Sequence, residues 1–420
     1  MTTIVSYASF DRALGQGGSG SPAESRTFLE SSEGDLNDAE LRTHLTQALS
    51  QLEYAQSRPG VLSETRDQLA SLMQSYMAEN PDEIRITTEP AVAGGFEVKY
   101  DEGDLLGWFR SVFTWWRRIR PERWLAASDV PEAVGGGERL RVALLGDWGT
   151  GLYGAPVSAR SIEHDARGYD LLLHLGDVYY SGTEKEVQEL FLDRWPKVPG
   201  AVSRALNSNH EMYSGGVGLF RRTLPTFGQQ ATHFAAQTNH WLLVGLDSAY
   251  AEHDLARDQA RWLERLLANA EDRQLVLFSH HQPFSLLESQ GPKLVTKLAR
   301  VLEQRRVFAW YWGHEHRCVL YDRDPVWRML GRCVGHGGFP GFRDKLGHFP
   351  VEDGDARWRR LPGKNLVPGG ILLDAPNSYI EGHEEEYGAH GYVSLEFDGP
   401  HLAETVHLPD GTKLRERELA

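Results

Sequence analysis

From Leu140 onwards, short apolar runs of strand length alternate with segments that carry helical spacing. This alternation constrains the fold strongly, because strands that alternate with helices build layered α/β domains. The expected strands are Leu140–Leu145, Leu171–Leu175, Val202–Leu206, Trp241–Leu246, Leu275–Phe278 and Val307–Trp312. The expected helices are Glu184–Arg194, Asp254–Ala268 and Lys293–Gln304. The sequence therefore predicts a layered α/β domain.

We expect this domain to occupy residues 139–420, after a linker at Pro131–Gly137. Beyond Gly369 the pattern becomes β-like, so residues 369–420 are predicted to form carboxyl-terminal strands. The segment 339–368 is rich in Gly and Pro, and long loops in compact domains tend to be functional or disordered. Our hypothesis for this segment is a lid loop that shapes substrate choice through Arg359 and Arg360.

The amino-terminal part of the chain differs in composition and in the spacing of its apolar residues. Residues 1–36 are predicted to be a disordered tail, because Gly15–Asp35 is rich in Gly, Ser and Glu. Residues 37–138 are predicted to form a helical extension. Apolar residues recur there at helical spacing on both sides of Pro59-Gly60, which predicts two antiparallel helices. The favoured interpretation is a packing appendage without chemistry of its own.

One part of this extension, residues 105–124, combines aromatic side chains with arginines. These are Trp108, Phe109, Phe113, Trp115, Trp116, Arg117, Arg118, Arg120 and Arg123. A basic aromatic helix is able to lie on a membrane surface or to dock a partner protein. Burial of the aromatic rings against the neighbouring domain is the favoured alternative.

Polar side chains follow five of the expected strands, at the point where each strand ends. They are Asp147, Asp177 with Tyr179 and Tyr180, Asn209 with His210 and Glu211, His280 with His281, and His314 with His316. Ligands of open α/β sheets bind at the carboxyl ends of strands. Each fragment alone is a weak signal, but five in order predict one common site. In His314-x-His316, alternate residues of an extended segment project to the same side.

The donor set favours Zn, Mn or Fe, because it offers oxygen and imidazole ligands without thiolates. A carboxylate can bridge two cations about 3.5–4 Å apart, and such a pair clamps the phosphoryl group in phosphate-ester hydrolysis. The predicted reaction is therefore the in-line attack of a metal-bound hydroxide on phosphorus.

Composition limits the partners. The formal net charge of −15 argues against nucleic acid, which is bound chiefly by Lys and Arg. A small phosphate-ester substrate stays compatible, because bound cations invert the local field. Two cysteines, Cys318 and Cys333, are expected to be reduced thiols. We see neither a signal peptide at Met1–Phe10 nor an apolar run of about 20 residues, so we expect a cytoplasmic protein. The oligomeric state is left open.

The five fragments together resemble the calcineurin-like metallophosphoesterase superfamily and, within it, the purple acid phosphatases. They read Asp147-Trp148-Gly149, Gly176-Asp177-Val178-Tyr179-Tyr180, Asn209-His210-Glu211, His280 and Gly313-His314-Glu315-His316. The resemblance covers residues 139–338 and leaves the amino-terminal third unexplained. It implies an α/β (α+β) fold, a four-layer α/β/β/α sandwich, that carries two metal ions.

The resemblance also implies a ligand set. Metal one is expected on Asp147, Asp177, Tyr180 and His316, and metal two on Asp177 as the bridge with Asn209, His280 and His314. Most superfamily members have His where Gly149 stands here, whereas purple acid phosphatases replace it by a Tyr three residues after the bridging Asp. Tyr180 has that spacing. This implies Fe3+ at the Tyr180 site and Fe2+, Zn2+ or Mn2+ at the other.

By the same resemblance, His210 is expected to contact the phosphate and to protonate the leaving oxygen, with Glu211 as its orienting partner. The chain departs from the family pattern at Ser208, where the family has Gly before the Asn. His280 and His281 are adjacent, and only one should be a ligand. His280 fits the spacing better, and His281 is the reserve choice.

The leading functional prediction is a phosphomonoesterase of purple acid phosphatase type. A phosphodiesterase acting at the same site, including on cyclic nucleotides, is the nearest alternative, because both reactions need the same nucleophile and clamp. A non-catalytic metal-binding scaffold is a third reading, with the amino-terminal extension as its interface. All positions of the ligand pattern are filled, which favours an enzyme.

Overall fold

The computed structural model describes residues 3–5, 43–48, 67–79, 86–90, 96–100, 112–113, 116–288, 292–343 and 348–420. The chain forms two compact units, Met1–Arg120 and Pro121–Ala420. All the predicted site residues belong to the second unit, which therefore carries the functional interest.

The first unit contains strands as well as helices. Residues 43–48 are helical, and α3 spans Gln68–Glu79. The strands β1 (Thr3–Val5), β2 (Ile86–Pro90) and β3 (Phe96–Tyr100) form a sheet in the order β1-β3-β2. The strands β2 and β3 lie within residues 37–138, which were predicted to be helical, and of the predicted disordered tail 1–36 only Thr3–Val5 is among the described residues. Ile, Thr, Val, Phe and Tyr in β2 and β3 favour strands, and β3 supplies the edge on which β1 pairs.

Parts of the predicted extension agree with helical packing. Leu45, Ala48, Leu69, Leu72 and Met73 were predicted at apolar helical positions, and all are buried. Gly15–Asp35, Pro59-Gly60 and, within the basic aromatic segment, residues 105–111, 114 and 115 lie outside the described residues.

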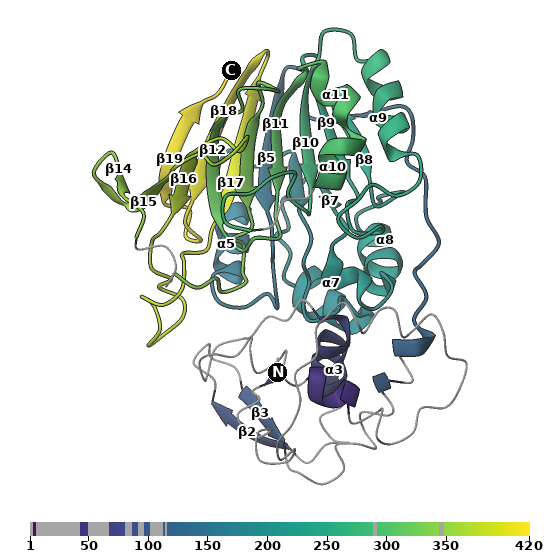
Figure 1. Cartoon of the computed structure of the whole chain (residues 1–420), viewed down its shortest axis with the longest axis vertical. Helices are drawn as coiled ribbons and strands as arrows, with labels where there is room; N and C mark the ends of the chain where they lie inside the picture. The colour runs from purple at the N-terminus through teal and green to yellow at the C-terminus, as the bar shows by residue number, and fades with distance from the viewer. Residues whose placement is uncertain are drawn as a thin grey trace. The chain divides into compact units, whose positions relative to one another are not determined.

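The second unit is built on two large sheets (Figure 1). In the described residues, the six-stranded sheet has the order β19-β18-β17-β5-β6-β7. Its strands are β5 (Arg139–Leu145), β6 (Leu171–His174), β7 (Val202–Ala205), β17 (Tyr392–Asp398), β18 (His401–His407) and β19 (Lys413–Glu418). The strands β5, β6 and β7 are mutually parallel, whereas β17, β18 and β19 extend the sheet in antiparallel fashion.

The other sheet has ten strands in the described residues, in the order β14-β15-β16-β12-β13-β11-β10-β9-β8-β4. They are β4 (Glu132–Ala133), β8 (Phe234–Gln237), β9 (Trp241–Leu246), β10 (Gln274–Ser279), β11 (Val307–Trp312), β12 (Cys318–Arg323), β13 (Leu330–Val334), β14 (Val351–Glu352), β15 (Asp355–Leu361) and β16 (Gly370–Leu373). Its centre, β9, β10, β11 and β13, is parallel.

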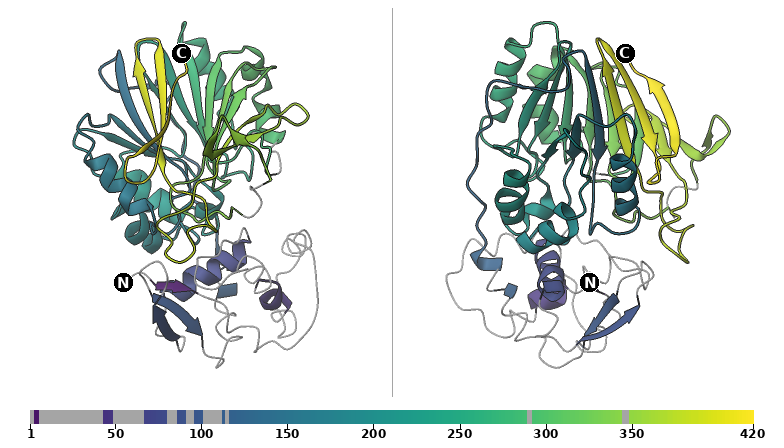
Figure 2. Two further views of the ribbon diagram at one scale, coloured as in Figure 1. Left: turned by 90° about the vertical axis from the view of Figure 1, so that its left-hand side faces the viewer. Right: turned by 180° about the vertical axis from the view of Figure 1, so that it is seen from behind.

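The two sheets face each other across one apolar core, as both views of Figure 2 show. Leu144 and Leu173 from the six-stranded sheet share this core with Val276 and Ala309 from the ten-stranded sheet. The opposite face of each sheet is also buried. Leu145, beside Leu144 in β5, belongs to a second apolar cluster on the outer face. Burial on both faces explains why the parallel strands read as continuous apolar runs.

Helices cover these outer faces. Ala159 and Ile162 of α5 (Ala155–Glu163) pack on the six-stranded sheet. Trp262, Leu263 and Leu266 of α9 (Gln259–Ala268) pack on the ten-stranded sheet. The order is helix, sheet, sheet, helix, so the predicted four-layer α/β/β/α sandwich is confirmed.

The remaining helices are short. They are α6 (Glu184–Glu186), η2 (Val187–Leu192), α7 (Asn209–Met212), η3 (Leu219–Thr223), α8 (Leu224–Thr226), α10 (Pro292–Lys297) and α11 (Ala299–Glu303). The helix predicted at Asp254–Ala268 begins only at Gln259, because Asp254 closes a tight turn with Ala251. The helix predicted at Lys293–Gln304 is divided into α10 and α11 around Leu298, which caps α11.

The predicted lid loop 339–368 contains two strands at the edge of the ten-stranded sheet. Within it, β14 and β15 pair with one another, and β15 pairs with β16. Trp358 of β15 is fully buried, and burial of such a large side chain fixes the strand to the sheet. Arg359 donates to Asp374 at 2.7 Å, and Arg360 is paired with Asp322. Both arginines thus form ion pairs on the sheet, and their role in substrate choice stays a hypothesis.

The second unit begins at Pro121, ahead of the predicted boundary at residue 139. The reason is that the segment 121–138 packs onto the sandwich. Trp124 stacks on His233 with ring centroids 4.9 Å apart, the Tyr250 hydroxyl donates to the Glu122 carbonyl at 2.8 Å, and β4 extends the ten-stranded sheet.

In the described residues, no helix combines the length and the apolar character that crossing a membrane requires.

Candidate metal centre

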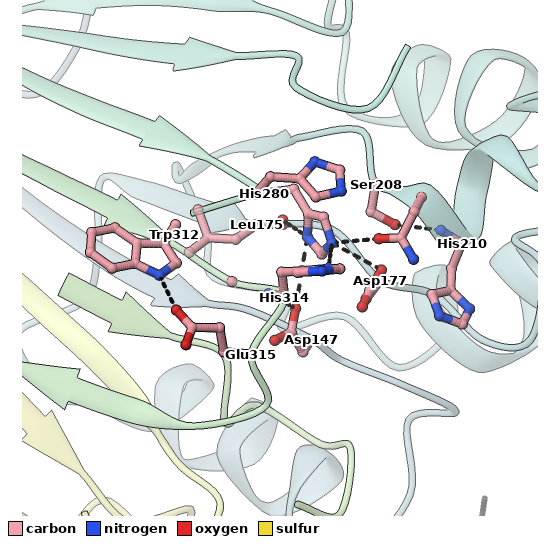
Figure 3. Close-up of polar contacts among 12 residues, drawn as sticks. Asp147, Leu175, Asp177, Ser208, His210, His280, Trp312, His314 and Glu315 are labelled. Carbon is pink, nitrogen blue, oxygen red and sulfur yellow. Dashed lines mark hydrogen bonds and ion pairs between the residues drawn. The ribbon is translucent and has the colours of Figure 1, made fainter. Parts of the chain in front are cut away.

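The carboxyl ends of strands from both sheets meet at one edge of the sandwich. Asp147 follows β5, Asp177 follows β6, Asn209 follows β7, His280 follows β10, and His314 and His316 follow β11. Figure 3 shows Asp147, Asp177, His280 and His314 pointing toward one another from these separate segments. The structure thus brings together six of the seven predicted ligands.

The first group consists of Asp147, Asp177 and His316, whose ligand atoms all lie within 4.8 Å of one another. The Asp147 carboxylate is held by backbone donors, because its Oδ1 accepts from the His314 N–H at 2.8 Å and its Oδ2 from the His316 N–H at 3.3 Å. A Cβ at Gly313 would lie 2.7 Å from Asp147 Oδ1. Only glycine therefore allows this close approach in Gly313-His314-x-His316.

The second group consists of Asp177, His280 and His314, again within 4.8 Å. His280 Nε2 lies 3.3 Å from Asp177 Oδ1, 2.9 Å from Asn209 Oδ1 and 3.1 Å from His314 Nδ1. The other ring nitrogen, Nδ1, donates to the Leu175 carbonyl at 2.9 Å. That bond orients Nε2 into the group, as the hydrogen-bonded second nitrogen of a metal-binding His does. His280, rather than the reserve choice His281, occupies this position.

Asp177 is the residue that the two groups share. Its Oδ1 faces His280 at 3.3 Å, and its Oδ2 faces His316 at 3.5 Å. A carboxylate whose two oxygens point to two separate donor groups has the geometry of a bridge between two cations.

The tyrosine near the first group is Tyr179. Its hydroxyl lies 2.9 Å from His316 Nε2 and 3.2 Å from Asp177 Oδ2. Its ring also lies against His210, with centroids 3.9 Å apart. Tyr180, which the spacing predicted as the ligand, contacts the site through its main chain, where its carbonyl accepts a hydrogen bond from His210 at 2.7 Å. The Tyr179 hydroxyl therefore lies beside the first group, and the assignment of Tyr180 as the ligand stays a prediction.

Comparison with known proteins relates this chain to a protein family. A sequence model of the calcineurin-like phosphoesterases matches residues 140–318. Residues 140–318 are thus similar in sequence to the calcineurin-like phosphoesterases. The match confirms the predicted resemblance and the predicted enzyme class, a hydrolase of phosphoric esters.

Individual relatives are acid phosphatases. This chain is 28% identical to tartrate-resistant acid phosphatase type 5 of Oryctolagus cuniculus, over 50% of this chain and 76% of that protein. It is 26% identical to the protein of the same name from Sus scrofa, over 48% and 70%. Among solved structures, a purple acid phosphatase from yellow lupin (Lupinus luteus) seeds matches with a TM-score of 0.48 and 16% identity. That match covers 67% of this chain and 53% of the lupin protein, so the chain spans about half of that relative's length.

The predicted catalytic residues of the phosphoesterase domain, His210 and Glu211, lie in α7 and are buried. The Ser208 hydroxyl accepts from their N–H groups, and Ser208 has an ordinary φ of −133°. The serine therefore replaces the family's glycine without strain and caps the first turn.

Glu211 has a different environment from the one predicted. The His210 Nδ1–H donates to the Tyr180 carbonyl, and this hydrogen bond orients the His210 ring. The Glu211 carboxylate instead accepts from the Ser208 hydroxyl and, at 3.3 Å, from the Asp177 N–H. Burial, together with the charge of Asp177, raises the pKa of Glu211 to about 8. Glu211 thus supports the loop that carries Asp177 rather than His210.

The backbone at the phosphoesterase site is strained. The angle φ is 56° at Asp147, 73° at Asp177, 71° at His314 and 50° at His316. Side-chain-bearing residues adopt this left-handed region rarely, and they persist there when the surroundings over-determine them. The chain turns sharply after β5, β6 and β11, and these turns direct the four side chains toward one another.

Electrostatics indicate that the site is built for cations. Burial, opposed by His316 and reinforced by Asp177, raises the pKa of Asp147 to about 8. Burial also disfavours the charge on Asp177, but His280, His210 and His316 hold its pKa well below the usual range. Burial lowers the pKa of His280 to about 4, which keeps its imidazole neutral and able to bind a metal. Buried oxygen and nitrogen donors without thiolates fit two cations.

Sequence reasoning missed three residues near this site. Tyr179 was passed over because the family spacing pointed to Tyr180. His253 and Ser248 follow β9, whose carboxyl end lies beside that of β10 in the sheet. The strand-end rule that found the other groups applies equally to β9, so the segment after Leu246 carried the missing signal.

Proposed function

We propose that the phosphoesterase domain is a dinuclear phosphomonoesterase of purple acid phosphatase type that acts on a small phosphate ester. The observation that carries this proposal is the position of Asp177 between two donor groups. Asp147 and His316 complete the site for one cation, and Asn209, His280 and His314 complete the site for the other.

The two cations, when bound, supply a strong nucleophile at neutral pH and neutralise the charge of the phosphoryl group. The chain's own residues position them. Asp177 sets their separation, and the backbone N–H groups of His314 and His316 fix the carboxylate of Asp147. Burial of these four residues excludes bulk water, which strengthens electrostatic interactions inside the site.

His210 is proposed as the proton donor to the leaving oxygen. Its Nδ1–H donates a hydrogen bond to the Tyr180 carbonyl at 2.7 Å. The other ring nitrogen, Nε2, is therefore the one that exchanges a proton with the substrate. A general acid in such a position contributes about 10²- to 10⁴-fold to the rate.

We further propose Fe3+ at the first site and Fe2+, Zn2+ or Mn2+ at the second. A phenolate is a hard anionic donor that suits a ferric ion. The Tyr179 hydroxyl, which touches both Asp177 and His316, supports this assignment.

The test compares hydrolysis of p-nitrophenyl phosphate with hydrolysis of bis(p-nitrophenyl) phosphate by the full chain loaded with iron and zinc. Preference for the monoester supports the proposal, and preference for the bis-ester makes the domain a diesterase. Asp177→Asn should abolish most activity on either ester. Asp324→Asn is the matched control, because Asp324 is also a buried carboxylate but binds the turn at Val326 and Trp327. Two bound cations without hydrolysis of any phosphate ester would favour a scaffold instead.

A further inference from the structure

A second histidine cluster adjoins the proposed dinuclear centre. His253, His281 and His314 place their ligand atoms within 4.8 Å of one another. The ring centroids are 3.9 Å apart for His253 and His281, 4.7 Å for His281 and His314, and 5.3 Å for His253 and His314. Two of these residues, His253 and His281, have no part in the dinuclear ligand set.

Ser248 holds His281 in place. His281 follows His280 directly after β10, and the two ring centroids are 4.8 Å apart. The Ser248 hydroxyl accepts from the His281 N–H at 3.0 Å and lies 3.0 Å from its ring Nδ1. Such a bond to one ring nitrogen directs Nε2 away from Ser248, as in metal sites where an outer partner orients the imidazole.

His253 reaches the cluster from the loop after β9. The loop closes in a tight turn in which Asp254 N–H donates to the Ala251 carbonyl at 2.7 Å. His253 itself has a left-handed φ of 53°. It is half-buried, whereas His281 and His314 are buried. The cluster therefore lies between the closed dinuclear centre and solvent.

We propose that His253, His281 and His314 form a third cation site, selective for a transition ion such as Zn2+. Three imidazoles with an open fourth position are a known ligand set for zinc. The donors are neutral, in contrast with the carboxylates of Asp147 and Asp177, so this ion binds more weakly than the dinuclear pair. The inference rests on the proposed dinuclear centre, because His314 is common to both.

Because His314 belongs to both groups, binding of the third ion affects the dinuclear centre. His314 Nδ1 lies 3.1 Å from His280 Nε2 in the dinuclear group. An ion bound by His253 and His281 competes for the same imidazole and weakens its hold on the second metal. Excess zinc therefore inhibits the enzyme through this cluster.

The experiment measures bound zinc in the full chain after equilibrium dialysis against increasing Zn2+. We expect two tight ions and a third, weaker one. His253→Ala and His281→Ala should each keep the two tight ions and lose the third. Ser248→Ala, which removes only the orienting hydroxyl, should weaken the third by about 10- to 100-fold. His240→Ala is the control, because this half-exposed histidine pairs with Glu138 and belongs to neither group. It should bind all three ions.

Two results would overturn the inference. One is a wild-type protein that saturates at two ions. The other is loss of a tight ion in His281→Ala, which would make His281 a ligand of the dinuclear centre. Hydrolysis of p-nitrophenyl phosphate is measured on the same samples at low zinc. A protein that binds three ions but hydrolyses no ester contradicts the proposed function and leaves the third site standing.

Discussion

At the scale of single residues, Tyr179 and Tyr180 occupy neighbouring positions with different surroundings. The hydroxyl of Tyr179 lies between Asp177 and His316, whereas the carbonyl of Tyr180 orients His210. Spectroscopy can separate them, because a ferric phenolate absorbs visible light.

Tyr179→Phe is expected to abolish the visible band of the iron-loaded protein, because it removes the phenol 2.9 Å from His316 Nε2. Tyr180→Phe is the matched control and should keep the band, since its main-chain carbonyl is unchanged. The measurement is the absorption spectrum after loading with iron in air. A band that survives in Tyr179→Phe and disappears in Tyr180→Phe would return the ligand to the position predicted from the sequence.

His210→Ala is expected to keep both metals and to lower kcat by about 10²- to 10⁴-fold, because it removes only the proposed proton donor. Metal analysis and steady-state kinetics on the same preparation check this. The loss should be smaller for esters with good leaving groups, which need little protonation. An equal loss for good and poor leaving groups would show that His210 does not protonate the leaving oxygen.

At the scale of elements, the segment 121–138 belongs to the sandwich through aromatic contacts. His233 lies between Trp124, at 4.9 Å, and Trp262, at 4.8 Å. Burial lowers the pKa of His233 from its ordinary 6.5 to about 4. The folded state therefore keeps His233 neutral where the unfolded chain would protonate it.

The sign of the resulting pH dependence follows from linkage. Below its ordinary pKa the unfolded chain binds the extra proton, so the contribution of His233 is present above pH 6.5 and lost as pH falls toward 4. Wild-type protein should lose about 2 kcal/mol more stability than His233→Gln between about pH 7 and pH 5. Chemical denaturation of both proteins at both pH values measures this. Equal losses would contradict the shifted pKa.

At the scale of the whole sandwich, a buried ion pair joins the two sheets. Arg332 of β13 donates to Glu404 of β18 at 2.9 Å, and the Tyr311 hydroxyl of β11 donates to the same carboxylate at 2.8 Å. Arg332 and Glu404 are each 1% exposed. Removing one partner leaves an uncompensated charge in the core, which is more costly than the pair itself.

Glu404→Gln is therefore expected to destabilise the protein by about 3–5 kcal/mol. The double variant Arg332→Met, Glu404→Leu should recover most of this loss, because neither charge then remains buried. Asp398→Asn, which breaks the exposed pair with Arg139, should change stability far less. Denaturant unfolding of the four proteins provides the measurement. A double variant as unstable as Glu404→Gln would contradict the explanation by unpaired charge.

The four-layer order of the sandwich was implied by the family resemblance. The sequence patterns by themselves determined the layered α/β domain and the meeting of Asp147, Asp177, Asn209, His280, His314 and His316. Both follow from local patterns, because continuous apolar runs specify strands buried on two faces, and parallel strands present their carboxyl ends at one edge. The enzyme class followed from the same residues.

Only the tertiary structure decided which tyrosine faces His316, that Glu211 supports the Asp177 loop, that His253 joins His281, and that Arg359 lies on a sheet edge. The physical reason is that these outcomes depend on left-handed turns after the strands and on contacts between segments far apart in the chain. Local periodicity carries no information about either.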